Sequence, residues 1–600
     1  MQNSSYLHKR EWMLVALALV SIVGQVFLDL KVPDYMQRIT MRVATPGTVA
    51  SDLTGDGALM LSAALGSLVL AVITGFCTAI VGTSLAKNLR QKVFSKTFEL
   101  SSAQVNNIGT DSLITRSTND VMQIQMFVVM GFQMLIKSPI MAIWASSKIA
   151  TQSMAWTVPT AIAVVATIIT LAVVIALVMP RMVRMQKITD GLNRVTREHI
   201  SGLRVIRAYT SQSFHRNRFE DVNADLRNTT LFVNTGFAFL MPMLTVIMNA
   251  LSLAIYGVGA HLINDAGSPG DKVTLFGQMV AFSSYALQVV SAFMMLAAVF
   301  IFAPRAWVSY TRVREVLGTE PDIADADASQ VPASSSVLPT GSATAPSSAT
   351  QTPAIEFDNV SFRYPGADND ALHGISFTVH RGETLAIIGS TGSGKSSLIS
   401  LIPRFSDVRK GSVKINGTDV RHMTQSELRN GIAYVPQKST LFSGTVASTI
   451  AFSHAEHDNA PQLVVSASKT AEAAEFIERA DKAYAAPVAS GGSNFSGGQK
   501  QRLSIARAVA YQAPLMIFDD SFSALDYKTD SLVRSHLHDA GADTTLVIVA
   551  QRIGTVKNAD KILVLDKGRA VGFGTHRELL ASNPVYQEIA RSQLSEEELA

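Results

Sequence analysis

The sequence predicts two different folds in one chain: an α-helical domain of six membrane spans and, after it, an α/β domain. Of the 600 residues, 48% are hydrophobic and only 16% are charged, which is unusual for a wholly soluble protein. The apolar residues are concentrated in the first half, whereas the second half alternates short apolar runs with turn residues. At least two domains follow from this split.

Six stretches of the first half are long and apolar enough to cross a bilayer, which takes about 20 mostly apolar residues as a helix. The first stretch follows His8-Lys9-Arg10 and could be mistaken for a signal peptide, but five later spans and no clear small-residue cleavage site favour a retained helix. The predicted spans are residues 11–32, 58–85, 124–147, 156–180, 231–263 and 273–303.

Lysine and arginine are distributed unevenly between the connecting segments. They are frequent in residues 87–116 and 181–227, which follow the second and fourth spans. The segments after the first, third and fifth spans carry only Arg38, Arg42, Lys148 and Lys272. By the positive-inside rule, we expect both termini in the cytoplasm and a multi-pass protein of the cell (inner or plasma) membrane. Charged residues within the spans are too few to indicate a selective substrate site.

Two polar stretches, residues 86–123 and 181–230, are too long for hairpin loops and too polar for lipid. They keep a helical spacing of apolar positions, as in Ile200, Leu203 and Ile206. We therefore predict that the spans extend into the cytoplasm as helices and that a short turn joins each pair.

Residues 324–353 are rich in Ala, Ser, Thr and Pro. Such a composition buries too little apolar surface to offset its ordering entropy, so a flexible tether without chemistry of its own is expected. The predicted domains are a membrane domain over residues 1–323, a linker over 324–353 and an α/β domain over 354–600.

The α/β half contains the pattern G-x-x-x-x-G-K-S between the apolar run Leu385–Ile388 and the helix-like Ser397–Ile402. Glycines let successive backbone N–H groups turn around an anion, and the following helix N-terminus favours negative charge. Lys395 is expected to reach the β- and γ-phosphates of ATP, and Ser396 to offer its hydroxyl to Mg²⁺. The predicted phosphate-binding residues are Gly389, Ser390, Thr391, Gly392, Ser393, Gly394, Lys395, Ser396 and Ser397.

Beyond this loop, residues 355–592 carry an ordered series of motifs that resembles the ATPase domain of ATP-binding cassette (ABC) transporters. The six spans with two cytoplasmic projections resemble the type IV, or exporter-type, membrane domain. The resemblance implies that Tyr364 stacks on adenine, that Gln437 contacts Mg²⁺ and senses the membrane domain, and that Asp519 binds Mg²⁺.

Two further segments resemble parts of this family that act on a second subunit. Arg204-Val-Ile-Arg-Ala-Tyr209 is similar to the second intracellular loop, where a short coupling helix docks on the partner's ATPase domain. The signature sequence, which contacts ATP held by the other subunit, is matched with Phe in place of the usual Leu by Phe495, Ser496, Gly497, Gly498 and Gln499.

Two positions depart from the family pattern. Asp520 stands where the family usually has the glutamate that acts as general base, and Gln551 stands where it has histidine. Withdrawing a carboxylate by about 1 Å can cost on the order of a hundredfold in rate, and an amide can neither carry the charge nor relay the proton of imidazole. The pattern resembles the degenerate-site subunit of bacterial heterodimeric ABC exporters, with Asp520, Gln551 and Gln437 as the catalytic-position residues.

The function expected from these features is ATP hydrolysis coupled to transport, mainly at the site completed on the partner, with export of hydrophobic or amphipathic compounds of multidrug, lipid or peptide type. The expected partners are a second half-transporter, the bilayer and the substrate, but not nucleic acid, because the net charge is only +4 and no basic stripe is present. An importer built on the same fold and an ATP-gated regulatory subunit remain alternatives. The transported substrate, the direction of transport, the identity of the partner and residual hydrolysis by Asp520 stay open.

Overall fold

The computed structural model describes residues 7–45, 48–150, 154–325, 352–452, 460–539 and 543–594. The chain forms two compact units. One contains Met1–Phe98 and Ile108–Thr319, and the other contains Glu99–Asn107 and Glu320–Ala600. Of the predicted linker, residues 326–351 lie outside the described part of the chain.

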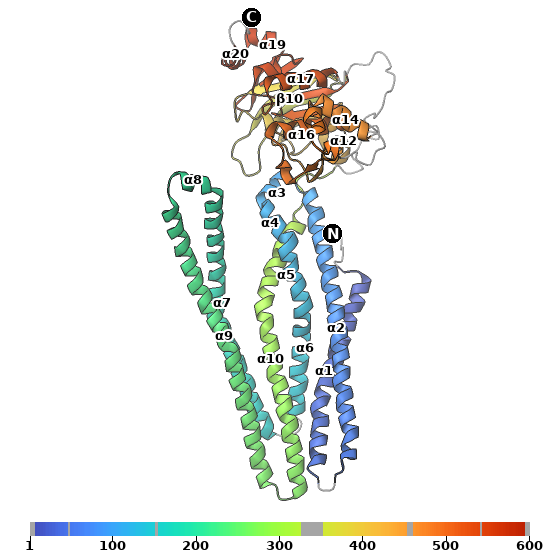
Figure 1. Cartoon of the computed structure of the whole chain (residues 1–600), viewed down its shortest axis with the longest axis vertical. Coiled ribbons are helices and arrows are strands. Elements are labelled where there is room, and N and C mark those ends of the chain that lie inside the picture. Colours follow the sequence, from blue (N-terminus) through green and yellow to red (C-terminus); the bar gives the residue numbers. More distant parts are fainter. Residues whose placement is uncertain are drawn as a thin grey trace. The chain divides into compact units, whose positions relative to one another are not determined.

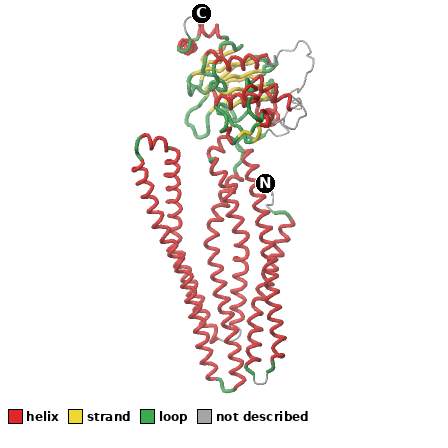
Figure 2. Tube along the Cα trace, in the orientation of Figure 1, coloured by secondary structure: helices red, strands yellow, loops and turns green. Residues whose placement is uncertain are grey.

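The first unit consists of long helices, as Figures 1 and 2 show. Six helical stretches of the described chain are long and apolar enough to cross a membrane, which confirms the predicted fold class. The third of them contains two π-helical turns. The elements are α1 (Lys9–Val43), α2 (Ala50–Glu99), α4 (Thr110–Thr115), η1 (Arg116–Asp120), α5 (Val121–Met126), η2 (Phe127–Gly131), α6 (Phe132–Ala150), α7 (Met154–Ser201), α9 (Gln212–Asp265) and α10 (Pro269–Gly318).

The polar stretches that follow the second and fourth spans are helical, as predicted. Helix α2 runs without a break to Glu99, and α7 runs to Ser201. A short helix stands at each turn: α3 (Ser102–Ile108) after α2, and α8 (Leu203–Ala208) between α7 and α9. The segment compared with a coupling helix is therefore helical.

Close helix packing holds α7, α9 and α10 together. The Trp156 ring of α7 stacks on Phe282 of α10 with ring centroids 5.3 Å apart. A Cβ at Gly259 of α9 would lie only 2.5 Å from the sulfur of Met279 and 2.8 Å from the Trp156 ring. A residue without a side chain is therefore needed where these helices approach, as is common between membrane helices.

The second unit is built on a six-stranded sheet of order β12-β11-β3-β10-β9-β6, in which all neighbours are parallel except β11 and β12. A four-stranded antiparallel sheet, β2-β1-β4-β5, and the two-stranded pair β7-β8 complete it. The strands are β1 (Ile355–Phe362), β2 (Leu372–Val379), β3 (Thr384–Gly389), β4 (Lys410–Ile415), β5 (Thr418–Asp419), β6 (Ile432–Val435), β7 (Gly444–Thr445), β8 (Pro487–Val488), β9 (Leu515–Asp519), β10 (Thr545–Val549), β11 (Lys561–Asp566) and β12 (Arg569–Gly574).

Three helices of the second unit have more than ten residues: α14 (Ala460–Thr470), α16 (Gly497–Ala510) and α17 (Tyr527–Asp539). The shorter helices after residue 320 are α11 (Lys395–Ser400), η3 (Val420–His422), α12 (Gln425–Asn430), α13 (Val446–Ala451), α15 (Ala474–Glu478), η4 (Ala483–Ala485), η5 (Ser490–Gly492), α18 (Ile553–Val556), α19 (His576–Ser582) and α20 (Pro584–Arg591).

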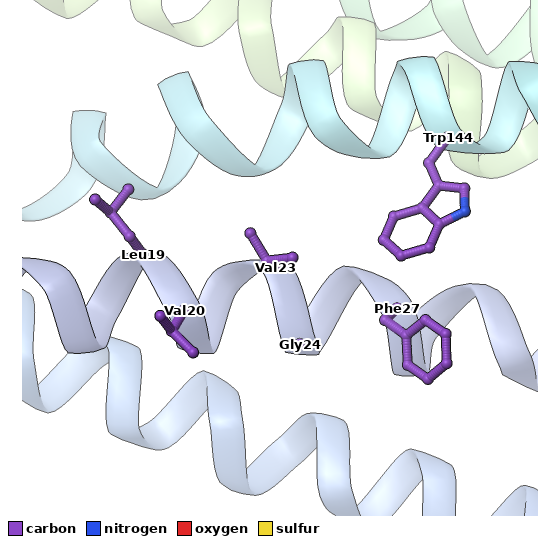
Figure 3. A pocket seen from close by; sticks show the side chains of 6 residues that line it. All are labelled: Leu19, Val20, Val23, Gly24, Phe27 and Trp144. Atoms are coloured by element: carbon purple, nitrogen blue, oxygen red, sulfur yellow. The ribbon is translucent and has the colours of Figure 1, made fainter.

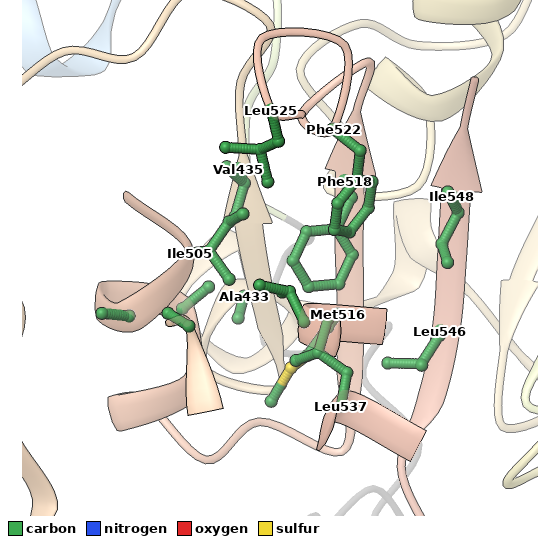
Figure 4. Close-up of a cluster of buried hydrophobic side chains, with 14 of the residues drawn as sticks. Ala433, Val435, Ile505, Met516, Phe518, Phe522, Leu525, Leu537, Leu546 and Ile548 are labelled. Atoms are coloured by element: carbon green, nitrogen blue, oxygen red, sulfur yellow. The ribbon is translucent and has the colours of Figure 1, made fainter. Parts of the chain in front are cut away.

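The central strands are buried on both faces, so their sequences are continuous apolar runs rather than alternating ones. Figure 4 shows Met516 and Phe518 of β9 packed among side chains of β6 and β10, with Phe522 and Leu525 above them. Every residue of β9 and of β10 is buried. In a parallel sheet, residues that follow the carboxyl ends of neighbouring strands meet at one edge, and the candidate site lies there.

Candidate functional site

The loop between β3 and α11 has the backbone geometry that its glycines permit. Gly392 and Gly394 have φ angles of +82° and +101°, in the left-handed region that side chains disfavour. At Gly389 a Cβ would lie 2.1 Å from the carbonyl oxygen of Leu565. Bulkier residues would push this loop away from β11, so these three glycines are needed to shape the cradle.

Lys395 is held inside that loop. Its Nζ donates hydrogen bonds to the carbonyl oxygens of Gly389 and Ser390, both at 2.8 Å. Burial lowers the pKa of this ammonium, and the carboxylates of Asp520 and Asp519 partly oppose the shift. A largely buried cation inside a ring of backbone amides is suited to a phosphate chain.

Ser396 and Asp519 meet directly, although they are 123 residues apart. The Ser396 hydroxyl donates to Oδ1 of Asp519 at 3.0 Å, and the Tyr434 hydroxyl donates to Oδ2 at 3.3 Å. Burial raises the pKa of Asp519, and these two hydrogen bonds act against that rise. The tyrosine is a site residue that the sequence analysis missed, because its ring lies on β6 and only the strand order brings it beside β9.

These two oxygens fit Mg²⁺, which in phosphate sites uses one or two protein oxygens and takes its other ligands from phosphate and water. Within the described residues, no group of three or more His, Cys, Asp or Glu side chains could hold a metal by itself. A Mg²⁺ held by Ser396 and Asp519 would neutralise negative charge on the phosphates. Gln437 contacts the neighbouring Asp520.

Tyr364 lies beside the phosphate loop, at the end of β1. Its hydroxyl is 2.8 Å from Oγ of Ser397, and its ring packs edge-on against Phe362. The side chain is still 48% exposed. The ring is therefore accessible next to the loop, and its contact with a nucleotide base stays a prediction.

The side chains of Asp520, Gln551 and Gln437 lie together in the structure. Oδ2 of Asp520 accepts hydrogen bonds from the amide of Gln551 at 2.8 Å and from the amide of Gln437 at 3.3 Å. Asp520 has a φ of +47° and is 8% exposed. Two neutral amides thus hold the Asp520 carboxylate. The backbone N–H of Asp520 also donates a hydrogen bond to the carbonyl oxygen of Val549.

The signature residues begin α16. Ser496 is its N-cap: Oγ accepts from the N–H of Gln499 at 3.3 Å, and the Gln499 side chain accepts from the N–H of Ser496 at 2.9 Å. Phe495 packs against the core beside Phe476. Ser496 and Gly497 are exposed, and Gly498 is partly exposed. In the described part of the chain, these residues form no hydrogen bond with the phosphate loop.

A second group of polar residues, which the sequence analysis left unassigned, gathers among the membrane spans. Asp29 of α1 pairs with Lys137 of α6 at 3.1 Å, and Asp34 of α1 pairs with Lys148 of α6 at 3.1 Å. Ser67, Tyr285 and Gln288 add hydrogen bonds from α2 and α10. Asp29 and Lys137 lie inside two predicted spans, and their opposite charges could have indicated this group from the sequence. Which charges pair depends on how the helices pack.

Both halves of the chain match known families. Residues 15–301 match the family described as ABC transporter transmembrane region, and residues 372–523 match the family described as ABC transporter. The chain therefore belongs to the ABC transporters, with an exporter-type membrane domain fused to an ATPase domain. It binds ATP, couples an ABC-type ATPase to transport, and is a multi-pass membrane protein with the ATPase domain in the cytoplasm.

Several relatives share most of the chain. An uncharacterized ABC transporter ATP-binding protein of Mycobacterium tuberculosis is 35% identical over 587 residues, which cover 97% of this chain and 95% of the relative. The ATP-dependent lipid A-core flippase of Saccharophagus degradans is 30% identical over 538 residues, or 88% and 86% of the two chains. A solved structure of a bacterial Atm1-family ABC exporter with ATP bound has the same fold, with a TM-score of 0.76, 24% identity and 98% coverage of both chains.

Proposed function

We propose that the chain is one subunit of a heterodimeric ATP-driven exporter in which its own nucleotide site binds Mg²⁺ and ATP but hydrolyses ATP slowly. The proposed organisation is a membrane domain over residues 1–323, a linker over 324–353 and an ATPase domain over 354–600. Hydrolysis occurs mainly at the second site, which this chain's signature completes on the partner.

The arrangement around Asp520 carries this proposal. A general base must accept a proton from the attacking water within hydrogen-bond reach. Here the Asp520 side chain is one methylene shorter than glutamate, and one of its oxygens already accepts two amide hydrogen bonds. The shorter side chain and the two amide contacts leave this carboxylate poorly suited to accept a proton from water.

Gln551 contributes to the same loss. Its amide donates to Asp520 and cannot protonate, so it supplies neither a positive charge nor a proton relay to the terminal phosphate. Lys395, Ser396 and Asp519, by contrast, keep the geometry of binding. The site therefore retains its affinity for the nucleotide while losing the groups that act on water.

The signature is built to serve another subunit. A helix N-terminus with exposed N–H groups binds an anionic phosphate group, and α16 presents Ser496 and Gly497 at its exposed start. The capping box keeps this start rigid whether or not a phosphate is present. A partner that holds ATP in its own phosphate loop would receive these donors across the dimer interface.

The turn at α8 supports docking on a partner. Ile206 is buried, which anchors the short helix, whereas Val205 is 60% and Tyr209 is 79% exposed. Arg204 and Arg207 surround these apolar side chains. Exposed apolar groups with a basic rim are typical of a protein contact surface, and the partner's ATPase domain is the proposed occupant.

For the substrate, we propose a hydrophobic or amphipathic compound moved outwards. One relative is named an ATP-dependent lipid A-core flippase, and the spans of this chain are mostly apolar. Transport into inverted vesicles by the assembled pair tests the direction. Accumulation inside such vesicles agrees with export, whereas uptake only in right-side-out vesicles would indicate an importer.

ATPase measurements on the purified chain, alone and with its co-purifying half-transporter, test whether hydrolysis occurs mainly at the second site. The lone chain should bind a fluorescent ATP analogue with ordinary affinity but show little ATPase activity, and the pair should hydrolyse ATP and be stimulated by a transported compound. Robust turnover by the lone chain would refute the slow site. Failure of any amphipathic compound to stimulate the pair would favour a regulatory subunit.

A further inference from the structure

The chain passes between its two units at three places, after Phe98, after Asn107 and after Thr319. The membrane spans present a largely apolar surface. Figure 3 shows one groove on it, which is lined by Leu19, Val20, Val23, Gly24, Phe27 and Trp144. The segments next to the three crossings carry hydrogen-bonding side chains instead. Directional contacts, which an apolar surface does not provide, are thus available at the crossings.

The side chain of Gln104, on α3, joins the segments at these crossings. Its amide nitrogen donates to the carbonyl oxygen of Glu320 at 2.7 Å and to Oδ1 of Asp322 at 2.9 Å. The other carboxylate oxygen of Asp322 accepts from the Ser101 hydroxyl at 3.3 Å. Side-chain hydrogen bonds thus tie the segment between the first two crossings to the segment after the third.

Residues 320–325 are attached in turn to the start of α12. Gln425, the first residue of that helix, donates its backbone N–H to Oδ1 of Asp325 at 2.9 Å and its side-chain amide to the carbonyl oxygen of Ile323 at 3.2 Å. Ile323 is buried, and a capping box fixes the start of the helix. A displacement of α12 would therefore be passed to residues 320–325.

The other end of α12 contacts the turn that follows the phosphate-loop helix α11. The Arg429 guanidinium donates from Nε to the carbonyl oxygen of Pro403 at 3.1 Å and from Nη2 to that of Arg404 at 3.0 Å. Its Cζ lies 5.3 Å from the ring centroid of Phe405, a cation–π distance. Burial lowers the pKa of Arg429, and the negative charge of Asp325 opposes that shift. Arg429 therefore fixes the turn after α11 relative to α12.

Both groups that would hold Mg²⁺ are connected to Phe405. Ser396 is the second residue of α11, and the Phe405 N–H donates to the carbonyl oxygen of Ser400, the last residue of that helix, at 3.0 Å. Tyr434, which donates to Asp519, packs edge-on against the Phe405 ring with centroids 5.5 Å apart. With a cation bound, Asp519 becomes a weaker acceptor for Tyr434, and the Ser396 hydroxyl no longer donates to it. Occupied and empty sites thus differ in the contacts on both sides of Phe405.

We propose that Arg429 is a positioning residue that passes the occupancy of the Mg²⁺ site through α12 to residues 320–325 and, by Gln104, to α3. ATP bound by this chain thus acts on its own membrane domain by a route inside the same chain. A ligand shifts a conformational equilibrium only through contacts that differ between the states, and the contacts around Phe405 supply that difference. The route depends on binding of Mg²⁺ and ATP, and it holds whether or not hydrolysis at this site is slow.

Hydrogen–deuterium exchange of the full chain in lipid nanodiscs, with saturating ATP and either Mg²⁺ or EDTA, tests this inference. Binding of a fluorescent ATP analogue, measured in parallel, separates a lost response from a lost ligand. In the unaltered chain, Mg²⁺ should slow amide exchange at least about fivefold in residues 99–107 and 320–325, the lower end of coupling between two sites.

Arg429→Met keeps an apolar stem of similar length but removes the charge and both hydrogen bonds. The slowing by Mg²⁺ should then fall below about twofold in both segments, since a residue within a coupling network can carry most of that effect. Arg429→Lys, which keeps a cation near Phe405, should restore part of the slowing. Recovery by the conservative variant distinguishes a positioning role from a general loss of packing.

Gln104→Leu interrupts the same route at a later point. Residues 320–325 should still respond to Mg²⁺, and residues 99–107 should not. Because Gln104 is only partly buried, the fold should persist, and this variant decides the question if the Arg429 variants do not fold.

The matched control is Arg502→Met, because Arg502 makes the same kinds of contact elsewhere in the ATPase domain. Its Cζ lies 4.8 Å from the Phe476 ring centroid, and its Nη1 donates to the carbonyl oxygen of Glu472 at 2.8 Å. Both responses should survive this change. The inference is overturned if the unaltered chain binds ATP without slower exchange in either segment, or if the Arg502 variant loses the response equally. A full response of residues 99–107 in the Arg429→Met or Gln104 variant, or no recovery with Arg429→Lys, overturns it too.

Discussion

The two sides of the nucleotide site differ in how closely their residues match the ABC family pattern. On the phosphate side, Lys395 is anchored to two loop carbonyls and Ser396 contacts Asp519. On the water side, Asp520 is held by Gln551 and Gln437, and no histidine is present at position 551. Hydrogen bonds fix the side chains on both sides of the site. The residues around Asp520 therefore form a defined structure, although their chemistry differs from the usual glutamate and histidine. If the proposed function is correct, ATP binding and ATP hydrolysis are separable within one fold.

The largest expected effect comes from removing the phosphate-side cation. Lys395→Ala should weaken ATP binding by the lone chain about 100-fold, because a buried charge-assisted contact contributes up to about 3 kcal/mol. Equilibrium binding of a fluorescent ATP analogue measures this change. Retained affinity would show that the loop backbone alone holds the phosphates. The proposed contrast between an intact phosphate-binding side and an altered catalytic side would then be wrong.

A pair of variants in the assembled transporter compares the signature with the water side. Gly497→Asp should lower ATPase activity about 100-fold, the scale of losing a donor to developing phosphate charge. A Cβ at Gly497 meets no atom within 4 Å, so the fold should persist and the added carboxylate should act only by repelling phosphate. Asp520→Asn should change the pair's activity by less than about twofold, since proton acceptance there contributes little. Equal losses would contradict the assignment of roles.

Restoring the missing groups tests the same contrast from the other direction. Asp520→Glu combined with Gln551→His should raise the ATPase activity of this chain's own site by about tenfold, because it returns a longer base and a titratable ring. The measurement is best made in a pair whose second site is silenced by Gly497→Asp. An unchanged rate would mean that the water side is limited by something other than these two side chains.

The sequence was a good guide to the parts of the molecule that depend on local pattern. The phosphate loop needs glycines at fixed positions, and apolar length alone defines six spans, so both could be predicted. Contacts that depend on strand order or on helix packing could not. Tyr434 reaches Asp519 only because β6 neighbours β9, and Lys137 reaches Asp29 only because α6 packs beside α1. The Asp520 side chain was predicted from its position, but the two amides that restrain it required the structure.

The smallest expected effect concerns the acid limit of metal-dependent binding. Asp519 must be deprotonated to hold Mg²⁺, and burial raises its pKa above the usual range. As pH falls, a proton should therefore displace Mg²⁺ earlier than at an ordinary aspartate, and the Mg²⁺ dependence of ATP affinity should disappear. Tyr434→Phe removes a hydrogen bond that lowers this pKa.

In the Tyr434 variant, the midpoint of that acid loss should move up by about 0.4 pH unit, since a long hydrogen bond that favours the ionised carboxylate by about 0.5 kcal/mol shifts its pKa by that amount. Titration of ATP affinity with and without Mg²⁺ between acidic and neutral pH measures it, and Tyr364→Phe, which keeps Asp519 unchanged, serves as the control. A downward shift, or the same shift in both variants, would show that Tyr434 does not act through Asp519. An upward shift in the Tyr434 variant alone would show that the Tyr434 hydroxyl lowers the pKa of Asp519 and so preserves the negative charge that binds Mg²⁺.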